Sequence, residues 1–287
     1  MSPHAVSLPR RFARLVRFEH TVFALPFAYV GALLAVDGWP GWEAMAWVTL
    51  AMVAGRTLAM ALNRLVDAEL DARNPRTASR ELPAGALSRP QVIVLCAAAL
   101  AAYLLAVFSL DPIVRWLWPI PVAAFVVYPY LKRFTWLCHL WLGACLGLAP
   151  VGAWLATTGS APWEAWALGS AVGAWVAGFD LFYSLFDLEH DHVAGLHSWA
   201  TRFGESGVFR GARFLHLLTV ALLAAVGAGL GSDGWYWAGV GAAAGLLLYE
   251  HSLVRPGDLR RLDAAFFTVN GVISVVFLGF VALDTLP

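Results

Sequence analysis

The strongest constraint on the fold is a succession of apolar runs of about 20 residues, separated by short polar breaks. A run of that length crosses the hydrocarbon core of a bilayer as an α-helix, because lipid offers no partner to an unpaired backbone group. We predict spans near 20–36, 43–64, 91–110, 113–131, 136–157, 164–186, 211–230, 234–253 and 264–284. The sequence therefore predicts an all-α integral membrane protein, with one domain over residues 1–287 formed by a bundle of about nine transmembrane helices.

The basic residues indicate how the bundle is oriented, because Lys and Arg gather in short cytoplasmic loops. With a cytoplasmic N-terminus, most of the 19 Lys and Arg residues fall on the cytoplasmic side, and Arg115 stands alone among the acidic residues of the other side. An odd number of spans then places the C-terminus outside. We expect a multi-pass protein of the bacterial inner membrane whose polar cytoplasmic loops, 72–90 and 192–210, cap the bundle.

The first 19 residues form a segment of different character from the spans. Arg10, Arg11, Arg14 and Arg17 alternate there with apolar residues, which is typical of an amphipathic helix lying on a membrane surface. The formal net charge of the whole chain is zero, so the composition indicates no nucleic-acid partner. We also predict no obligate protein partner, and expect the lipid bilayer to be the main surroundings of the chain.

One carboxylate pattern occurs twice, 120 positions apart, as Asn63-x3-Asp67-x3-Asp71 and Tyr183-x3-Asp187-x3-Asp191. Spacing by four places each set on one helical face, where like charges repel by about 0.2–0.5 kcal/mol per pair even in water. Ionisable residues within membrane segments mark binding sites, and these two sets end spans that run in the same direction. We therefore predict that one cytoplasmic-facing metal site is formed by Asp67, Asp71, Asp187 and Asp191.

The ligand chemistry of the predicted metal site favours Mg²⁺, which binds carboxylate oxygens and completes its shell with water and phosphate oxygens. Two facing carboxylate pairs suit two Mg²⁺ ions around a diphosphate, and a diphosphate at a membrane site indicates an isoprenoid substrate. The negative charge that remains requires cations, and arginine binds phosphate through its forked guanidinium group. The predicted cytoplasmic loops supply Arg73, Arg76, Arg80, Lys132 and Arg133.

Residues around the two sets extend the pattern. The first set continues into Asn74-Pro75-Arg76-Thr77, the second begins at Asp180-x2-Tyr183, and residues 128–135 read Tyr-Pro-Tyr-Leu-Lys-Arg-Phe-Thr. Together these motifs resemble the signatures of the UbiA superfamily of membrane prenyltransferases. Glu81 stands where that family often has proline, which leaves the role of Arg80 open. The opening Phe18-Glu19-His20-Thr21 is similar to the 4-hydroxybenzoate polyprenyltransferase-like branch, some members of which serve menaquinone synthesis by the futalosine route.

The resemblance implies Mg²⁺-dependent transfer of a polyprenyl group from its diphosphate to an aromatic acceptor, inside a nine-helix bundle. By that carry-over the four aspartates bind two Mg²⁺ ions and the diphosphate with help from Asn63, while Arg76, Lys132 and Arg133 neutralise the leaving group. Asp180 and Tyr183 are the candidates for organising the attack or accepting the proton lost from the ring. The acceptor would be 4-hydroxybenzoate-like or dihydroxynaphthoate-like, in ubiquinone or menaquinone biosynthesis.

Other functions stay open at this level. The same fold can act on haem, chlorophyllide or a glycerol phosphate lipid, since the diphosphate end of the site would look similar. A cation transporter would also carry paired intramembrane carboxylates. A transporter site is expected near the membrane midplane on broken helices, however, whereas these carboxylates lie at span ends beside arginine-rich loops.

Overall fold

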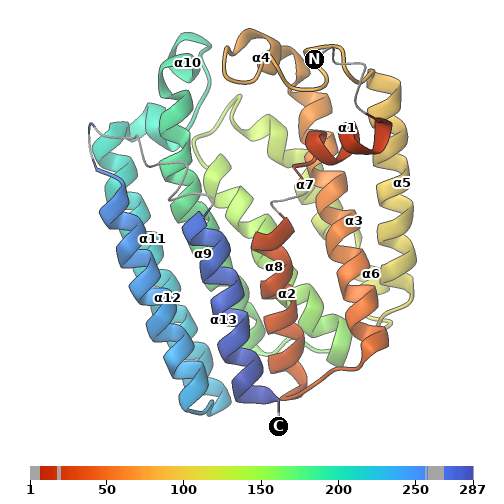
Figure 1. Cartoon of the computed structure of the whole chain (residues 1–287), viewed down its shortest axis with the longest axis vertical. Coiled ribbons are helices and arrows are strands. Elements are labelled where there is room, and N and C mark those ends of the chain that lie inside the picture. Colours follow the sequence, from red (N-terminus) through yellow and green to blue (C-terminus); the bar gives the residue numbers. More distant parts are fainter. Residues whose placement is uncertain (1–6, 18–20, 256, 258–267, 287) are drawn as a thin grey trace.

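The computed structural model describes residues 7–17, 21–255, 257 and 268–286, and its regular elements there are helices (Figure 1). In chain order they are α1 (Leu8–Leu15), α2 (Thr21–Val36), α3 (Trp42–Val66), α4 (Ala68–Arg73), α5 (Arg89–Phe108), α6 (Val114–Leu117), α7 (Pro119–Leu131), α8 (Cys138–Thr158), α9 (Trp163–Tyr183), the 3-10 turn η3 (Ser184–Asp187), α10 (Leu188–Val193), α11 (Trp199–Leu230), α12 (Gly234–Leu253) and α13 (Asn270–Thr285). Residues 18–20, which include the predicted Glu19 and His20 motif, lie outside the described ranges.

The predicted all-α membrane architecture is confirmed. Six helical stretches within the described ranges are long and apolar enough to cross a membrane: Trp42–Val66, Arg89–Phe108, Val114–Leu131, Cys138–Thr158, Trp163–Val193 and Trp199–Leu230. Two shorter apolar helices, Ala24–Val36 and Asn270–Thr285, run beside them. Each predicted span overlaps a described helix, but the count of nine crossings and the single-domain organisation stay predictions, as does the orientation in the membrane.

Both carboxylate motifs lie where a long helix breaks and a short one follows. After α3, Asp67 has φ −92° and ψ 6° and α4 continues from Ala68. After α9, the chain tightens into η3 and α10 continues from Leu188. The short helices span 68–73 and 188–193, so both of their bounds differ by the same 120 positions as the motifs. Figure 1 shows α4 and α10 together at one end of the bundle, which we call the cap end, opposite the end of α13.

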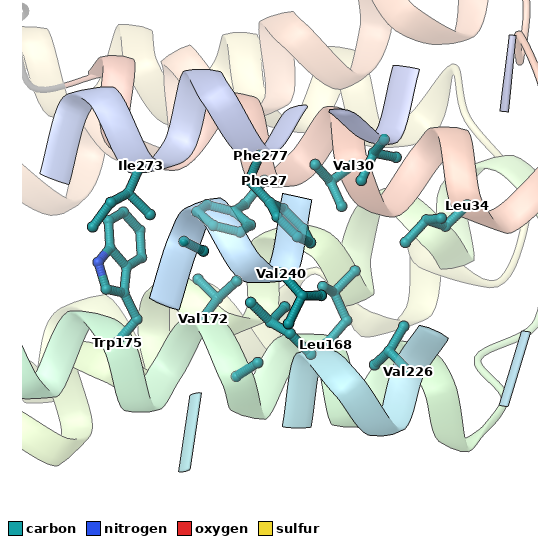
Figure 2. Close-up of a cluster of buried hydrophobic side chains, with 14 of the residues drawn as sticks. Phe27, Val30, Leu34, Leu168, Val172, Trp175, Val226, Val240, Ile273 and Phe277 are labelled. Atoms are coloured by element: carbon teal, nitrogen blue, oxygen red, sulfur yellow. The ribbon is translucent and has the colours of Figure 1, made fainter. Parts of the chain in front are cut away.

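The largest core cluster draws most of its residues from α2, α9, α12 and α13 (Figure 2). In Figure 1 these helices lie on the side of the bundle away from α5. Its centre is aromatic, with ring centroids 5.0 Å apart for Phe27 and Trp175 and 5.9 Å apart for Phe27 and Phe277. The Trp175 indole donates to Asn270 Oδ1 over 2.7 Å, and Asn270 Nδ2 donates to Glu250 Oε1 over 3.1 Å. These bonds satisfy polar groups that would be costly to bury alone, and they tie α9 to α12 and α13.

Helices α8 and α9 approach so closely that their contact requires glycine. A Cβ atom added to Gly143 would collide with the carbonyl oxygen of Gly173, and one added to Gly147 would collide with that of Gly169. Small residues allow such backbone contact in membrane bundles, where packing rather than hydrophobic burial drives helix association. The contact fixes the relative position of α8 and α9, which carry side chains of the site described below.

The amphipathic N-terminal segment includes helix α1. Arg10 and Arg14 are exposed, whereas Leu15 and Val16 are buried in a cluster with Leu58 of α3. Arg11 Nη1 donates to the carbonyl oxygen of Ala86 over 3.0 Å. The structure thus anchors the C-terminal end of α1 on the bundle, and its contact with a membrane surface remains a prediction.

The glycine contact gives a stability prediction. Gly143→Ala should destabilise the protein by about 1–3 kcal/mol, because an overpacked contact between rigid backbones has little room to relax. Thermal unfolding of purified protein in detergent measures the change. Gly152→Ala on the same helix is the matched control, since its Cβ would meet nothing within 4 Å. Equal melting temperatures for the two variants would contradict the role of the α8–α9 contact.

Candidate active site

The four predicted metal-binding aspartates lie at the cap end, and each is near its own basic side chain. Asp67, Asp71 and Asp191 are buried, and Asp187 is half-buried. The basic partners are Arg133, Arg80, Lys132 and Arg76, respectively. The structure therefore brings together eight residues that the sequence assigned to one site, in four oppositely charged pairs.

Asp67, at the break between α3 and α4, accepts hydrogen bonds on both oxygens. Asn63 Nδ2 donates to Oδ2 over 3.0 Å, and Arg133 Nη2 donates to Oδ1 over 3.1 Å. Arg133 also donates to the carbonyl oxygen of Val66 over 3.1 Å, which holds the loop after α7 against the end of α3. Burial raises the pKa of Asp67 above its ordinary value, although the hydrogen bond from Arg133 acts in the opposite direction.

Asp71, one turn further on in α4, is held by Arg80. A single guanidinium nitrogen, Arg80 Nη1, lies 2.7 Å from Oδ1 and 2.8 Å from Oδ2. Arg64 Nη1 lies 4.0 Å from Asp71 Oδ2 and donates to Asn63 Oδ1 over 3.2 Å. Arg80 therefore contacts the site despite the departure at Glu81. This arrangement links the Asn63 amide to both aspartates of the first motif.

Asp187 is bound by the loop that follows the first motif. Arg76 Nε donates to Oδ1 over 2.9 Å and Arg76 Nη2 donates to Oδ2, so the pair is two-pronged. Asn74 Nδ2 also donates to Oδ1, over 3.0 Å, and Arg76 Nη1 donates to the Tyr183 hydroxyl over 2.9 Å. Burial acts to lower the pKa of Arg76, but its hydrogen bonds and the charge of Asp187 outweigh burial and raise it.

Asp191 has the weakest pairing of the four. Its Oδ1 is buried without a hydrogen-bond partner in the described part of the chain, and the nearest cation, Lys132 Nζ, lies 3.8 Å away. The backbone N–H of His197 donates to the carbonyl oxygen of Lys132 over 2.7 Å, which places Lys132 beside the second motif. A buried carboxylate oxygen with no hydrogen bond is costly, and such an atom is a candidate metal ligand.

The donor set fits Mg²⁺ in its chemistry, because the inward-facing groups are carboxylate and amide oxygens. Among the described residues, no three His, Cys, Asp or Glu side chains lie close enough together to hold a metal ion by themselves. That finding is compatible with Mg²⁺, which usually takes one or two carboxylates and fills its remaining positions with water and substrate phosphate. The roles of the four aspartates as ligands remain predictions.

An apolar cavity of about 360 Å³ lies inside the bundle, directly below the charged residues. It is lined along α3 from Val48 to Asn63, a distance of about 22 Å at 1.5 Å per residue. Most of its lining is aliphatic and aromatic, from α3, α5, α7, α8 and α9. Among the described lining residues, Arg56 and Asp180 are the charged ones, and Asn63 connects the cavity to the pairs at the cap end.

The predicted residues differ in where they lie relative to the cavity. Asp180 lines it, whereas Tyr183 is one turn closer to the cap end and bonds Arg76. Arg73, at the end of α4, is exposed and forms no ion pair with the described residues. The structure thus offers no support for Arg73 as part of the site, and its proposed contact with substrate stays untested.

A sequence comparison identifies the family. The profile of the UbiA prenyltransferase family matches residues 24–272, which is most of the chain. The chain belongs to this family. The chain is therefore a prenyltransferase, which confirms the prediction made from the resemblance of its two motifs to the family signatures.

Curated relatives of this UbiA-family chain agree in length and name. A 4-hydroxybenzoate octaprenyltransferase from Methylococcus capsulatus is 31% identical over 289 residues, covering 98% of this chain and 97% of the relative. One from Aromatoleum aromaticum is 29% identical over 273 residues, covering 94% and 92%. The similarity therefore extends over nearly the whole of both proteins.

Solved structures show the same fold. The apo structure of a UbiA homolog from Aeropyrum pernix K1 superposes with a TM-score of 0.85 at 32% identity, covering 92% of this chain and 98% of that protein. A UbiA homolog from Archaeoglobus fulgidus, solved bound to DMAPP and Mg²⁺, superposes with a TM-score of 0.70 at 19% identity, covering 94% and 97%. The second likeness is one of fold alone.

Three residues at this UbiA-family site were missed by reasoning from sequence. Asn74 bonds Asp187, Arg56 lines the cavity, and His139 of α8 forms a 2.6 Å contact with Asp180. Arg56 and His139 are ionisable residues inside apolar helices, and that is the signal that could have found them. Asn74 belongs to the motif Asn74-Pro75-Arg76-Thr77, and that motif is the signal that could have found it.

The charge pairs give a second stability prediction. Arg80→Ala should destabilise the folded protein by about 1–3 kcal/mol, because it leaves the buried Asp71 carboxylate without its two shortest hydrogen bonds. Arg89→Ala is the control, since Arg89 pairs with Glu69 at 3.1 Å where both side chains are mainly exposed, and such pairs contribute about 0–1 kcal/mol. Thermal unfolding in detergent compares the two variants. The interpretation is wrong if both lose the same stability.

Proposed function

We propose that this chain transfers a polyprenyl group from its diphosphate to an aromatic acceptor within the membrane, in a Mg²⁺-dependent reaction of ubiquinone or menaquinone biosynthesis. The observation that carries the proposal is the arrangement of eight charged side chains, four of each sign, over the mouth of an apolar cavity. The charged layer suits a metal-bound diphosphate, and the cavity suits the prenyl group attached to that diphosphate.

The diphosphate half of the proposal rests on the basic partners. Arg76 lies in the loop after α4, and Lys132 and Arg133 lie in the segment after α7, so an anion between the two motifs can be contacted from both segments. Bound at Asp67, Asp71, Asp187 and Asp191, two Mg²⁺ ions would stabilise the negative charge that develops on the departing diphosphate. Arg76 and Arg80 would add hydrogen-bond donors suited to phosphate oxygens.

The cavity suits the prenyl group and the allylic cation that ionisation leaves. Its lining includes the aromatic rings of Tyr103, Phe125, Tyr128 and Phe179, whose faces attract cations. An apolar interior also excludes water, which would otherwise capture the cation. These features distinguish a prenyl-transfer site from a cation pathway, which is lined by polar groups.

The acceptor half rests on Arg56 and Asp180. Arg56 places a positive charge beside the apolar cavity, where a carboxylate on an aromatic ring would be a suitable partner. Asp180 lies on the opposite wall, on α9, and is the candidate for accepting the proton that the ring loses after attack. The curated relatives named 4-hydroxybenzoate octaprenyltransferases support a 4-hydroxybenzoate-like acceptor and a long prenyl chain.

The proposed reaction is tested with purified protein in detergent, a polyprenyl diphosphate, Mg²⁺ and a panel of acceptors. We expect release of diphosphate and a prenylated product with 4-hydroxybenzoate or a dihydroxynaphthoate, and loss of both when EDTA removes the metal. The panel includes haem, chlorophyllide and a glycerol phosphate lipid. If haem, chlorophyllide or the glycerol phosphate lipid alone gives product, that compound and not an aromatic ring is the acceptor. If no acceptor gives product, the result counts against prenyl transfer.

The metal-binding aspartates are tested by substitution with matched controls. Asp67→Ala and Asp187→Ala should each lower kcat by about 100-fold or more, because each removes a ligand for the ion that stabilises the leaving group. Glu69→Ala and Glu189→Ala are the controls, since these exposed carboxylates occupy matching positions of α4 and α10. The assignment fails if the aspartate variants, still folded by thermal unfolding, turn over like the glutamate variants.

A further inference from the structure

His139 forms a buried pair with Asp180 inside the bundle. Its Nδ1 lies 2.6 Å from Asp180 Oδ2, and both side chains are largely buried, with exposed fractions of 10% and 16%. His139 belongs to the first turn of α8, and Asp180 belongs to the last turn of α9. The sequence motifs account for Asp180 but assign nothing to His139.

The two side chains have different access to the cavity. Asp180 lines it together with Asn63 and Tyr128, whereas His139 is not among the lining residues. His139 therefore lies behind Asp180 as seen from the cavity. A group in that position acts on the reacting atoms through Asp180 and not by touching them.

The pair is held by a close backbone contact between α8 and α9 that glycine makes possible. Gly143, one turn after His139, approaches the carbonyl oxygen of Gly173, which lies about two turns before Asp180. Because the backbones meet directly there, neither helix can shift without opening the contact. The packing of α8 on α9 thus fixes the distance between the imidazole and the carboxylate.

The remaining nitrogen of His139, Nε2, is buried and has no hydrogen-bond partner in the described residues. Leaving that polar atom unsatisfied costs free energy that an apolar side chain of similar size would avoid. Packing alone therefore does not explain histidine at position 139. The contact that the imidazole gains in return is the one with Asp180, a residue facing the cavity.

We propose that His139 is a positioning residue for Asp180: it holds Oδ2 of that carboxylate and keeps the other oxygen directed to the acceptor ring in the cavity. This inference rests on the proposed prenyl transfer. A carboxylate buried alone is expensive, and pairing with an imidazole N–H lowers that cost. His139 thereby keeps Asp180 in one orientation in a site with few other polar groups.

The step that depends on this geometry follows the attack on the allylic cation. A ring electron pair forms the new carbon–carbon bond, while the carbon–oxygen pair has already left with the diphosphate. The ring then loses the proton from the attacked carbon, and the electrons of that carbon–hydrogen bond restore aromaticity. Asp180 accepts the proton, and its hydrogen bond to His139 aims the accepting oxygen.

Two polar variants of similar size separate positioning from packing. His139→Asn places an amide near the position of Nδ1 and should keep kcat within about threefold of wild type, whereas His139→Gln places its amide near Nε2 and should lose about tenfold or more, like His139→Leu. The KM for the prenyl diphosphate should stay unchanged in all three. Thermal unfolding in detergent confirms that each variant is folded.

An isotope effect provides a readout that a purely structural role would not move. With an acceptor deuterated at the attacked ring carbon, His139→Gln should show a larger effect on kcat than wild type, because proton removal has become slower. Asp180→Asn should lose activity, and adding His139→Gln to it should cause no further loss, since His139 acts through Asp180.

The outcomes distinguish this inference from the function on which it rests. If the wild-type protein forms no prenylated product, the proposed function itself is wrong. If the wild type is active, three results would overturn the role of His139 alone. The kcat of the Gln and Leu variants could be within about twofold of wild type, or the isotope effect on kcat could be unchanged in His139→Gln. The third result is a loss of kcat from the His139 substitutions that multiplies with the loss from Asp180→Asn.

Discussion

The pairing of buried carboxylates with basic side chains is the interaction on which the cap end depends. A carboxylate removed from water loses several kcal/mol of solvation unless a cation and hydrogen-bond donors replace it. Here Asp67 takes its partner from the segment after α7, Asp71 takes one from the loop after α4, and Asp187 takes one from the same loop. Two of these pairs, Asp67 with Arg133 and Asp187 with Arg76, join segments far apart in the sequence.

The apolar cavity affects the charged pairs at the cap end because it excludes water from one side of them. Charges interact more strongly where water is excluded, and the apolar walls below the aspartates provide such surroundings. In the proposed reaction, a cavity with few polar residues would shield the allylic cation from water. With the proposed function, a charged layer next to an apolar cavity would let one bundle hold both ends of an allylic diphosphate.

The sequence predicted the helical membrane fold and most of the cap end, because both follow from local patterns. Apolar runs mark the long helices, and spacing by four places the two aspartates of each motif one turn apart. Asp67 and Asp187 lie at the helix breaks, and Asp71 and Asp191 lie on the short helices α4 and α10. The partner of each aspartate depends on how separate helices pack, which no local pattern encodes. Arg73 and Arg76 have the same predicted role and are both exposed, yet Arg76 pairs with Asp187 whereas Arg73 forms no ion pair with the described residues.

The His139–Asp180 pair was beyond prediction for the same reason. It exists because Gly143 and Gly173 allow α8 and α9 to touch, and a sequence shows glycines without showing which backbone they face. An ionisable residue in an apolar helix does indicate that His139 has a polar partner, without indicating which one. Only the packed helices show that the partner of His139 is Asp180, 41 positions away on the next helix.

The two motifs repeat at 120 positions, but their counter-charges do not. The positions matching Arg76 and Arg80 in the later half are Leu196 and Ala200, so the later carboxylates borrow both of their cations, Arg76 and Lys132, from the earlier half. The carboxylates of the site therefore repeat along the chain, whereas its cations do not. Because a chain is synthesised from its N-terminus, both cations that pair with the second motif are present before that motif is made.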